Sequence, residues 1–147
     1  MTRRLSAAAC GALLAFGVLS TTVKADDLRE QWAHLNQAKR VQKSCWNAMD
    51  VRNWGHAIAY CQAAAEAWAT VADDEDGDPQ MTPNERNGTR AMEGGFLVIA
   101  AQAAISAGLK DEAPGFLSSA RSVADRLRPG ADKRQLLNDI KLRARVL

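Results

Sequence analysis

The sequence predicts an all-α protein of about five helices in antiparallel hairpins with one disulfide, and three observations lead to this prediction. Alanine, the best helix former, occurs 22 times in residues 26–147, whereas Val, Ile and Thr, which are less favourable in helices, together occur 13 times. Apolar residues recur at steps of three and four, as on one face of a helix. Capping and helix-breaking residues then divide the chain into five segments.

The first 25 residues are expected to be a cleavable secretory signal. Arg3 and Arg4 precede an uncharged stretch from Leu5 to about Leu19, and small residues lead up to a cleavage position after Ala25. Retention of the segment as an anchor is the alternative. Export through the Sec pathway is favoured over the twin-arginine pathway, because the Phe expected after the arginine pair is missing.

Removal of this segment changes the charge of the chain. The whole sequence has 19 basic and 17 acidic side chains, and residues 26–147 keep 16 basic and 17 acidic ones. A nearly neutral chain of about 120 residues fits one small domain and argues against a nucleic-acid partner, which would require a large basic excess.

The first helix is expected from about Leu28 to Met49, because its apolar residues fall on one face. Asn53 can cap a second helix from Trp54 to about Val71. Two helices joined by so short a connection must lie antiparallel.

Cys45 and Cys61 are the only cysteines after the signal, which in an exported chain favours a disulfide. Residue 53, in the expected turn, lies midway between them in sequence, so the two side chains should face each other across the hairpin. The cross-link should stabilise the fold by about 3 kcal/mol.

Residues 73–79 contain five acidic side chains and two helix breakers, and are expected to form an exposed loop. Thr82, Pro83 and Glu85 then have the spacing of a capping box with Pro in the first turn. The third helix should therefore run from Pro83 to about Ala107.

Asp111 is expected to cap a fourth helix that ends near Leu127, and Asp132 a fifth that ends near Val146. Three glycines lower the helix propensity of the third helix. Close packing against a bulky neighbour is the preferred explanation for all three, and a helix kink is the alternative: Gly88, Gly94 and Gly95.

The second hairpin repeats part of the first at an offset of 56 residues. The corresponding positions are Cys45, Ala57, Tyr60 and Ala64 in the first hairpin and Ala101, Ala113, Phe116 and Ala120 in the second. This spacing resembles the tetratricopeptide repeat, in which small side chains let paired helices approach closely. The resemblance is best over residues 38–72 and implies a protein-binding scaffold without catalysis. An unrelated helical bundle with the same hairpins is the alternative.

Catalytic and metal sites are not expected. His34 and His56 are the only histidines, and no Ser or Cys nucleophile stands at a recognisable spacing from either. An EF-hand centred on Gly77 fails, because Ala72 and Pro83 occupy positions that require carboxylates. We therefore expect no enzyme and no cofactor.

Partner contacts are expected from aromatic and charged residues. Trp32 and Trp68 are assigned to the core, whereas Trp46 and Trp54 are candidates for contact with a partner. Charged candidates lie in the acidic segment and the basic C-terminal helix: Asp74, Asp76, Asp78, Lys133, Arg134, Lys141, Arg143 and Arg145. The basic helix could contact an acidic partner or, less favourably, an anionic membrane surface.

These features predict a periplasmic or secreted module that binds another protein in a groove lined by the inner helices. The alternative is a small helical inhibitor or immunity-type protein that blocks an exported enzyme, with residues 73–81 as the contact.

Overall fold

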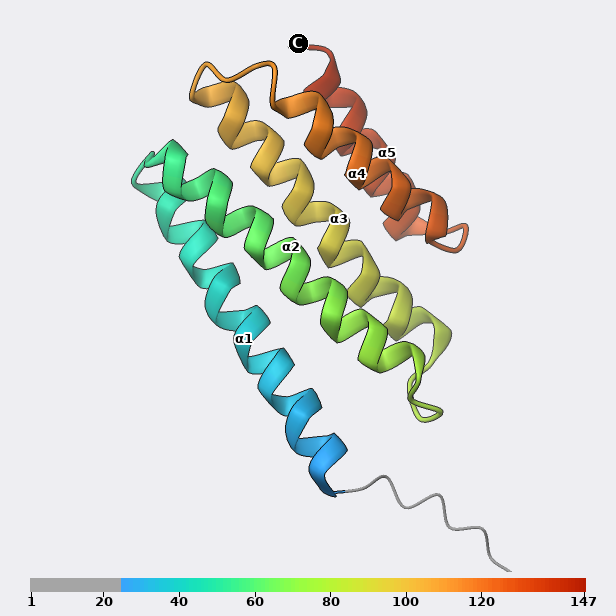
Figure 1. Cartoon of the computed structure of the whole chain (residues 1–147). Helices are drawn as coiled ribbons and strands as arrows, with labels where there is room; N and C mark the ends of the chain where they lie inside the picture. Colours follow the sequence, from blue (N-terminus) through green and yellow to red (C-terminus); the bar gives the residue numbers. More distant parts are fainter. Residues whose placement is uncertain (1–24) are drawn as a thin grey trace, which may run out of the picture.

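The computed structural model describes residues 25–147, which form five α-helices and no strand (Figure 1). The helices are α1 (Ala25–Asp50), α2 (Trp54–Asp76), α3 (Pro83–Ser106), α4 (Ala113–Arg126) and α5 (Ala131–Ala144). The prediction of an all-α fold with one disulfide is confirmed for this part of the chain. The expected signal segment lies outside the described residues, apart from its last residue.

The helices lie side by side in chain order from α1 to α4, with α5 against α3 and α4 (Figure 1). α1 and α2 form one antiparallel hairpin, and α3 and α4 form the second. Phe96 and Ala100 of α3 pack with α1 and α2, while Val98 and Ala101 pack with α4 and α5. α3 therefore joins the two halves of the core.

The small residues that repeat between the two hairpins are all fully buried: Cys45, Ala57, Ala64, Ala101, Ala113 and Ala120. Small side chains at these positions shorten the distance at which two helix axes can pack. The aromatic pair of the repeat behaves differently, because Tyr60 is exposed and Phe116 is partly buried against the core.

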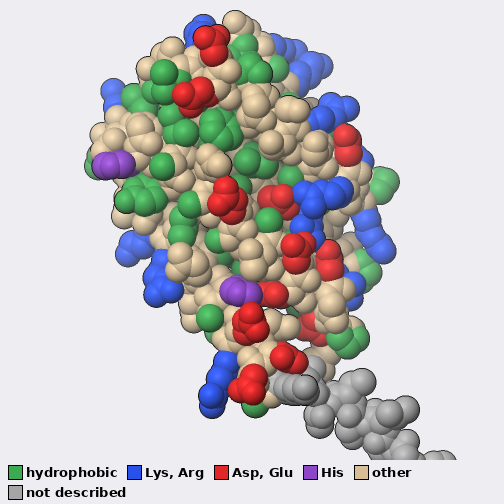
Figure 2. All heavy atoms as spheres, viewed as in Figure 1, with side chains coloured by type: hydrophobic (Ala, Val, Ile, Leu, Met, Phe, Trp, Pro, Cys, Tyr) green, Lys and Arg blue, Asp and Glu red, His purple; other side chains and the backbone are tan. Residues whose placement is uncertain are grey.

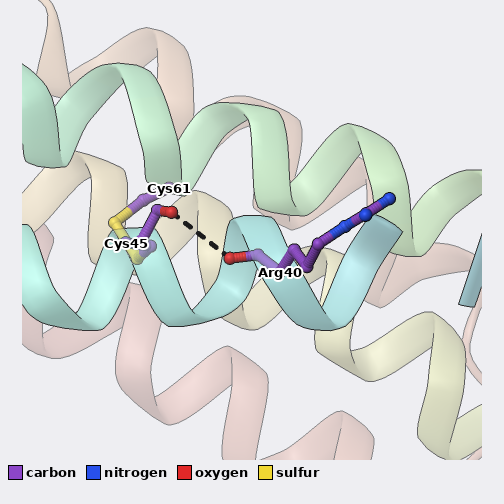
Figure 3. The surroundings of a disulfide bond; sticks show 4 residues. Arg40, Cys45 and Cys61 are labelled. Atoms are coloured by element: carbon purple, nitrogen blue, oxygen red, sulfur yellow. Dashed lines mark hydrogen bonds between the residues drawn. A yellow bond between two sulfur atoms is a disulfide. The ribbon is translucent and has the colours of Figure 1, made fainter. Parts of the chain in front are cut away.

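The disulfide joins α1 and α2 as predicted. The Cα atoms of Cys45 and Cys61 are 4.7 Å apart, and both residues are fully buried. Figure 3 shows the bond between facing turns of the two helices, with the Arg40 side chain directed away from the sulfurs. The Ser44 hydroxyl donates a hydrogen bond to the Arg40 carbonyl (3.3 Å), as is common for serine within a helix.

The turn between α1 and α2 places Arg52 at a φ of 56°, the one non-glycine residue with positive φ among residues 25–147. The turn is closed by backbone hydrogen bonds from Arg52 to Met49 (3.1 Å) and from Asn53 to Ala48 (2.9 Å). A side chain in this left-handed conformation costs about 1 kcal/mol, which glycine avoids.

We therefore expect Arg52→Gly to raise the free energy of unfolding by about 0.5 kcal/mol, after the larger loss of chain entropy for glycine is subtracted. Val51→Gly, at the neighbouring position without positive φ, is the control and should give no gain. Urea unfolding of both variants measures the difference. If Arg52→Gly destabilised the protein, the conclusion that the positive φ of Arg52 is unfavourable would be contradicted.

The prediction of a loop over residues 73–79 is wrong for residues 73–76, because α2 continues to Asp76, and confirmed for residues 77–79, which lie outside the helices. Asp73 and Asp76 each accept a hydrogen bond from Arg90, at 2.8 and 2.6 Å. Asp74 lies 2.7 Å from His34 of α1. Carboxylates at a helix C-terminus are unfavourable for the helix dipole, and these three contacts offset that effect.

Two of the predicted helix caps are confirmed and two are wrong. The Asn53 side chain accepts a hydrogen bond from the third residue after it, and Thr82 forms the predicted capping box. Asp111 and Asp132 do not cap, because α4 and α5 have no side-chain hydrogen bond at their N-caps. Asp132 lies one residue inside α5 and accepts a hydrogen bond from Asn87 instead (3.2 Å).

The explanation of the α3 glycines holds for one of the three. A Cβ atom at Gly94 would collide with Leu136 of α5 and lie close to Val123 of α4. At Gly88 and Gly95 a Cβ atom would meet nothing within 4 Å. The prediction of close packing is therefore confirmed for Gly94 and wrong for the other two glycines, which leave an open face on α3.

Candidate partner-binding groove

A shallow groove of about 340 Å³ runs along this open face of α3. Its residues come from α1, α3 and the first turn of α5: Gln42, Trp46, Gly88, Ala91, Met92, Gly95, Phe96, Ile99 and Asp132. Most of these side chains are apolar, and Asp132 is the one charged residue among them. This composition is that of a site for apolar groups with two polar groups at its edges, Gln42 and Asp132.

The sequence of α3 produces the floor of the groove. Gly88, Met92, Gly95 and Ile99 follow each other at steps of four, three and four residues and so lie on one helix face. Because the two glycines have no side chain, the backbone of α3 is accessible before Met92, at Gly88, and between Met92 and Ile99, at Gly95. A partner can therefore approach this helix more closely than it could approach a helix face covered by side chains.

Trp46 forms the wall on the α1 side. Its side chain is 44% exposed, and its ring centroid lies 5.8 Å from that of Phe96, with the two rings tilted by 59°. Such a tilted arrangement is favourable for aromatic pairs. One part of the indole is thus fixed by the buried Phe96, while the rest is accessible to a partner.

Gln42 is held in place beside Trp46 by a contact from α2. The buried Trp68 donates a hydrogen bond from Nε1 to Gln42 Oε1 (3.0 Å). This bond satisfies the indole N–H and fixes the amide at the edge of the groove. The α1 wall is therefore ordered before any partner binds.

The other tryptophans lie away from the groove. Trp68 is buried as predicted, but Trp32 is 62% exposed, so its assignment to the core is wrong. α1 contributes no residue to the core before Leu35, and Trp32 lies in this outer part of the helix. Trp54 is partly buried against Ala48 and Ala57 near the first turn, which leaves little of it for a partner.

The acidic candidates are mostly used within the molecule. Asp74 contacts His34 and Asp76 contacts Arg90, whereas the Asp78 carboxylate accepts a hydrogen bond only from the nearby backbone of Gln80 (2.8 Å). Figure 2 shows acidic side chains gathered toward the lower end of the molecule in that view. Asp74 and Asp76 therefore stabilise the α1–α2–α3 arrangement, whereas Asp78 forms no ion pair within residues 25–147.

The basic candidates are spread along α5. Arg134, Lys141 and Arg145 are exposed, while Lys133 and Arg143 are partly buried. Lys133 donates to the Leu127 carbonyl (3.4 Å). Lys141 and Arg143 lie in the last turn of α5, where positive charge is favourable for the helix dipole. None of these five residues lines the groove.

Glu75 at the end of α2 has a buried carboxylate oxygen, Oε2, without a hydrogen-bond partner among the described residues. Burial raises the pKa of this carboxyl above its usual value, a hydrogen bond from Thr89 acts in the opposite direction, and the charges of Asp76, Glu85 and Asp74 raise it further. The ionised form is thus less favourable in the folded chain than in the unfolded chain.

We expect Glu75→Gln to stabilise the protein at neutral pH by less than about 1 kcal/mol, since the side chain remains partly solvated. The unfavourable contribution of the carboxylate is complete above its raised folded-state pKa and disappears as the pH falls below its unfolded-state pKa. The stability gained by Glu75→Gln should therefore vanish at about pH 4. Urea unfolding at both pH values measures it, with Glu66→Gln, exposed on the same helix, as control. An equal gain at both pH values would contradict this account.

Trp46 was predicted from the sequence as a partner contact, whereas the other residues of the groove were not. The steps from Gly88 to Ile99 could have indicated one continuous helix face, but the same steps are expected for a buried face. The ion pairs of Arg90 were also missed, because its partners lie 14 and 17 residues away in the sequence.

No protein-family model, curated protein or solved structure matches this chain. Within residues 25–147, no helix combines the length and the apolar character needed to cross a membrane. The same residues contain no group of three or more His, Cys, Asp or Glu side chains placed to hold a metal ion.

Proposed function

We propose that this protein is an exported, non-catalytic module that binds a segment of another protein in the groove on α3. The observation that carries the proposal is the half-exposed Trp46 beside an open, apolar helix face. Tryptophan is among the residues that contribute most to binding energy at protein interfaces, particularly where its ring is already held in place.

The dimensions of the groove indicate the kind of segment. Gly88 and Ile99 are 11 residues apart on α3, which corresponds to roughly 17 Å along the helix axis. This length matches about three turns of a partner helix. Asp132 at one edge favours a partner with apolar side chains and a basic residue near one end.

Two further features support the proposal. The disulfide between α1 and α2 is of a kind that persists in oxidising compartments, which supports a periplasmic or extracellular location. The burial of the repeated small residues supports an arrangement like that of tetratricopeptide repeats, for which binding of other proteins is the implied role.

Site-specific photo-crosslinking in the native compartment tests where a partner binds. The Cβ atom of a photoreactive residue at Gly95 would meet nothing within 4 Å, and its side chain would contact a segment bound in the groove. Gly55, also free of contacts but at the start of α2, is the matched control, and Gln80 reports on the loop between α2 and α3. We expect one defined adduct from position 95 alone. An adduct from position 80 alone would instead support the inhibitor alternative.

A further inference from the structure

A second depression, of about 420 Å³, lies where the end of α2, the start of α3 and the end of α4 meet, apart from the groove. Its residues are Asp73, Asp76, Pro83, Arg86, Asn87, Arg90, Arg126, Leu127 and Arg128. We refer to it as the arginine pocket. Four arginines line this one depression, and the proximity of their positive charges is unfavourable unless anions balance them.

Two of the four arginines are balanced by carboxylates of this chain. Arg90 pairs with Asp73, Asp76 and Glu93, and Arg126 donates to the other oxygen of Glu93 (2.9 Å). Burial acts to lower the pKa of Arg90, but the hydrogen bonds with its two aspartates outweigh it and raise the pKa. All three carboxylates are therefore engaged by these two arginines.

Arg86 and Arg128 have no such partner among the described residues. Arg86 donates only to the backbone carbonyls of Asp78 (2.9 Å) and Met81 (2.8 Å), and its Nε is buried without an acceptor. The side chain of Arg128 makes no hydrogen bond or ion pair within residues 25–147, while its backbone N–H donates to Asn87 (2.8 Å). The whole guanidinium of Arg128 and the Nη1 group of Arg86 are thus available for an external anion.

We propose that the arginine pocket binds a small organic oxyanion, with Arg86 and Arg128 contacting its phosphate or carboxylate group. The planar guanidinium of Arg128 presents paired N–H donors that match the oxygens of either group, and Arg86 adds the donors of Nη1. The volume is within the range of small-molecule sites and exceeds what a single inorganic ion requires. Asp73 and Asp76 at the same pocket can accept hydrogen bonds from hydroxyl groups of the ligand.

Isothermal titration calorimetry at low salt tests this site with two probes, pyrophosphate for phosphate chemistry and citrate for carboxylate chemistry. We expect saturable binding of at least one probe, weakened about tenfold by Arg128→Gln, as for the loss of one charged hydrogen bond. Arg145→Gln removes the same charge from the exposed end of α5 and should leave the affinity within about twofold.

Arg86→Gln should weaken binding similarly. If that variant fails to fold, Arg128→Gln decides alone, because the Arg128 residue is exposed and its side chain makes no hydrogen bond or ion pair within residues 25–147. Absence of saturable binding of both probes would overturn the proposal, as would equal weakening by Arg128→Gln and Arg145→Gln. The groove is formed by other residues, so neither result bears on partner binding there.

Discussion

Replacement of both Cys45 and Cys61 by Ala is expected to lower the free energy of unfolding by about 3 kcal/mol. The bond joins residues 16 positions apart, and its main effect is to restrict the unfolded chain. For a domain of this size such a loss is a large part of the total stability. The helices should keep their arrangement, because both positions lie among buried alanines of the α1–α2 contact and an alanine there introduces no steric collision.

Urea unfolding of the double variant and of the wild type, each with and without reductant, measures this effect. Reduced wild-type protein is the control, since it loses the bond and keeps the sulfur atoms. It should match the double variant to within about 0.5 kcal/mol. A double variant as stable as the oxidised wild type would show that packing between α1 and α2 suffices without the cross-link.

The second large effect is expected at the contact between α3 and α5. Leu136→Ala should cost about 3 kcal/mol, because Leu136 is 3% exposed and its removal leaves a cavity beside Gly94. Gly94→Ala should also destabilise the protein, since the added methyl group would collide with Leu136. We expect a net cost of about 1 kcal/mol after the gain in helix propensity.

The double variant of Gly94→Ala and Leu136→Ala separates this contact from other effects. The methyl group added at position 94 should occupy part of the space that Leu136 leaves, so the double variant should be more stable than Leu136→Ala alone. Gly95→Ala, in which the methyl group meets nothing within 4 Å, is the matched control and should be stabilising in both backgrounds. If the double variant lost as much stability as the two single variants together, a contact between residues 94 and 136 would be contradicted.

The parts of the fold that the sequence predicted depend on local rules. The first hairpin, its Asn53 cap and the Thr82 capping box follow from residues close to one another in sequence, and the pairing of Cys45 with Cys61 follows from their equal distance to the turn. Such rules apply whatever the rest of the chain does.

The end of α2 could not be predicted from local rules. Four successive acidic residues at a helix C-terminus favour a loop, since they oppose the helix dipole. The decisive partners are Arg90 on α3 and His34 on α1, which reach the segment only after the helices have packed. Tertiary contacts here outweigh local preference.

The groove was predictable only in part, for a similar reason. The turn of α1 that places Cys45 in the hairpin directs Trp46 away from it, so the exposure of this tryptophan follows from helix geometry. The roles of Gly94 and Gly95 differ although the two residues are adjacent. One faces Leu136 and the other faces open space, and only the position of α5 decides between them.

The most direct test of partner binding in the groove is the affinity of the crosslinked partner for two tryptophan variants. Trp46→Ala removes the wall of the groove, whereas Trp32→Ala removes a more exposed tryptophan on the same helix, outside the groove. We predict that Trp46→Ala weakens binding at least about tenfold, as for a central interface tryptophan, and that Trp32→Ala changes it by less than about twofold. Equal affinities of the Trp46→Ala variant and the wild type would contradict the assignment of the groove as the binding site.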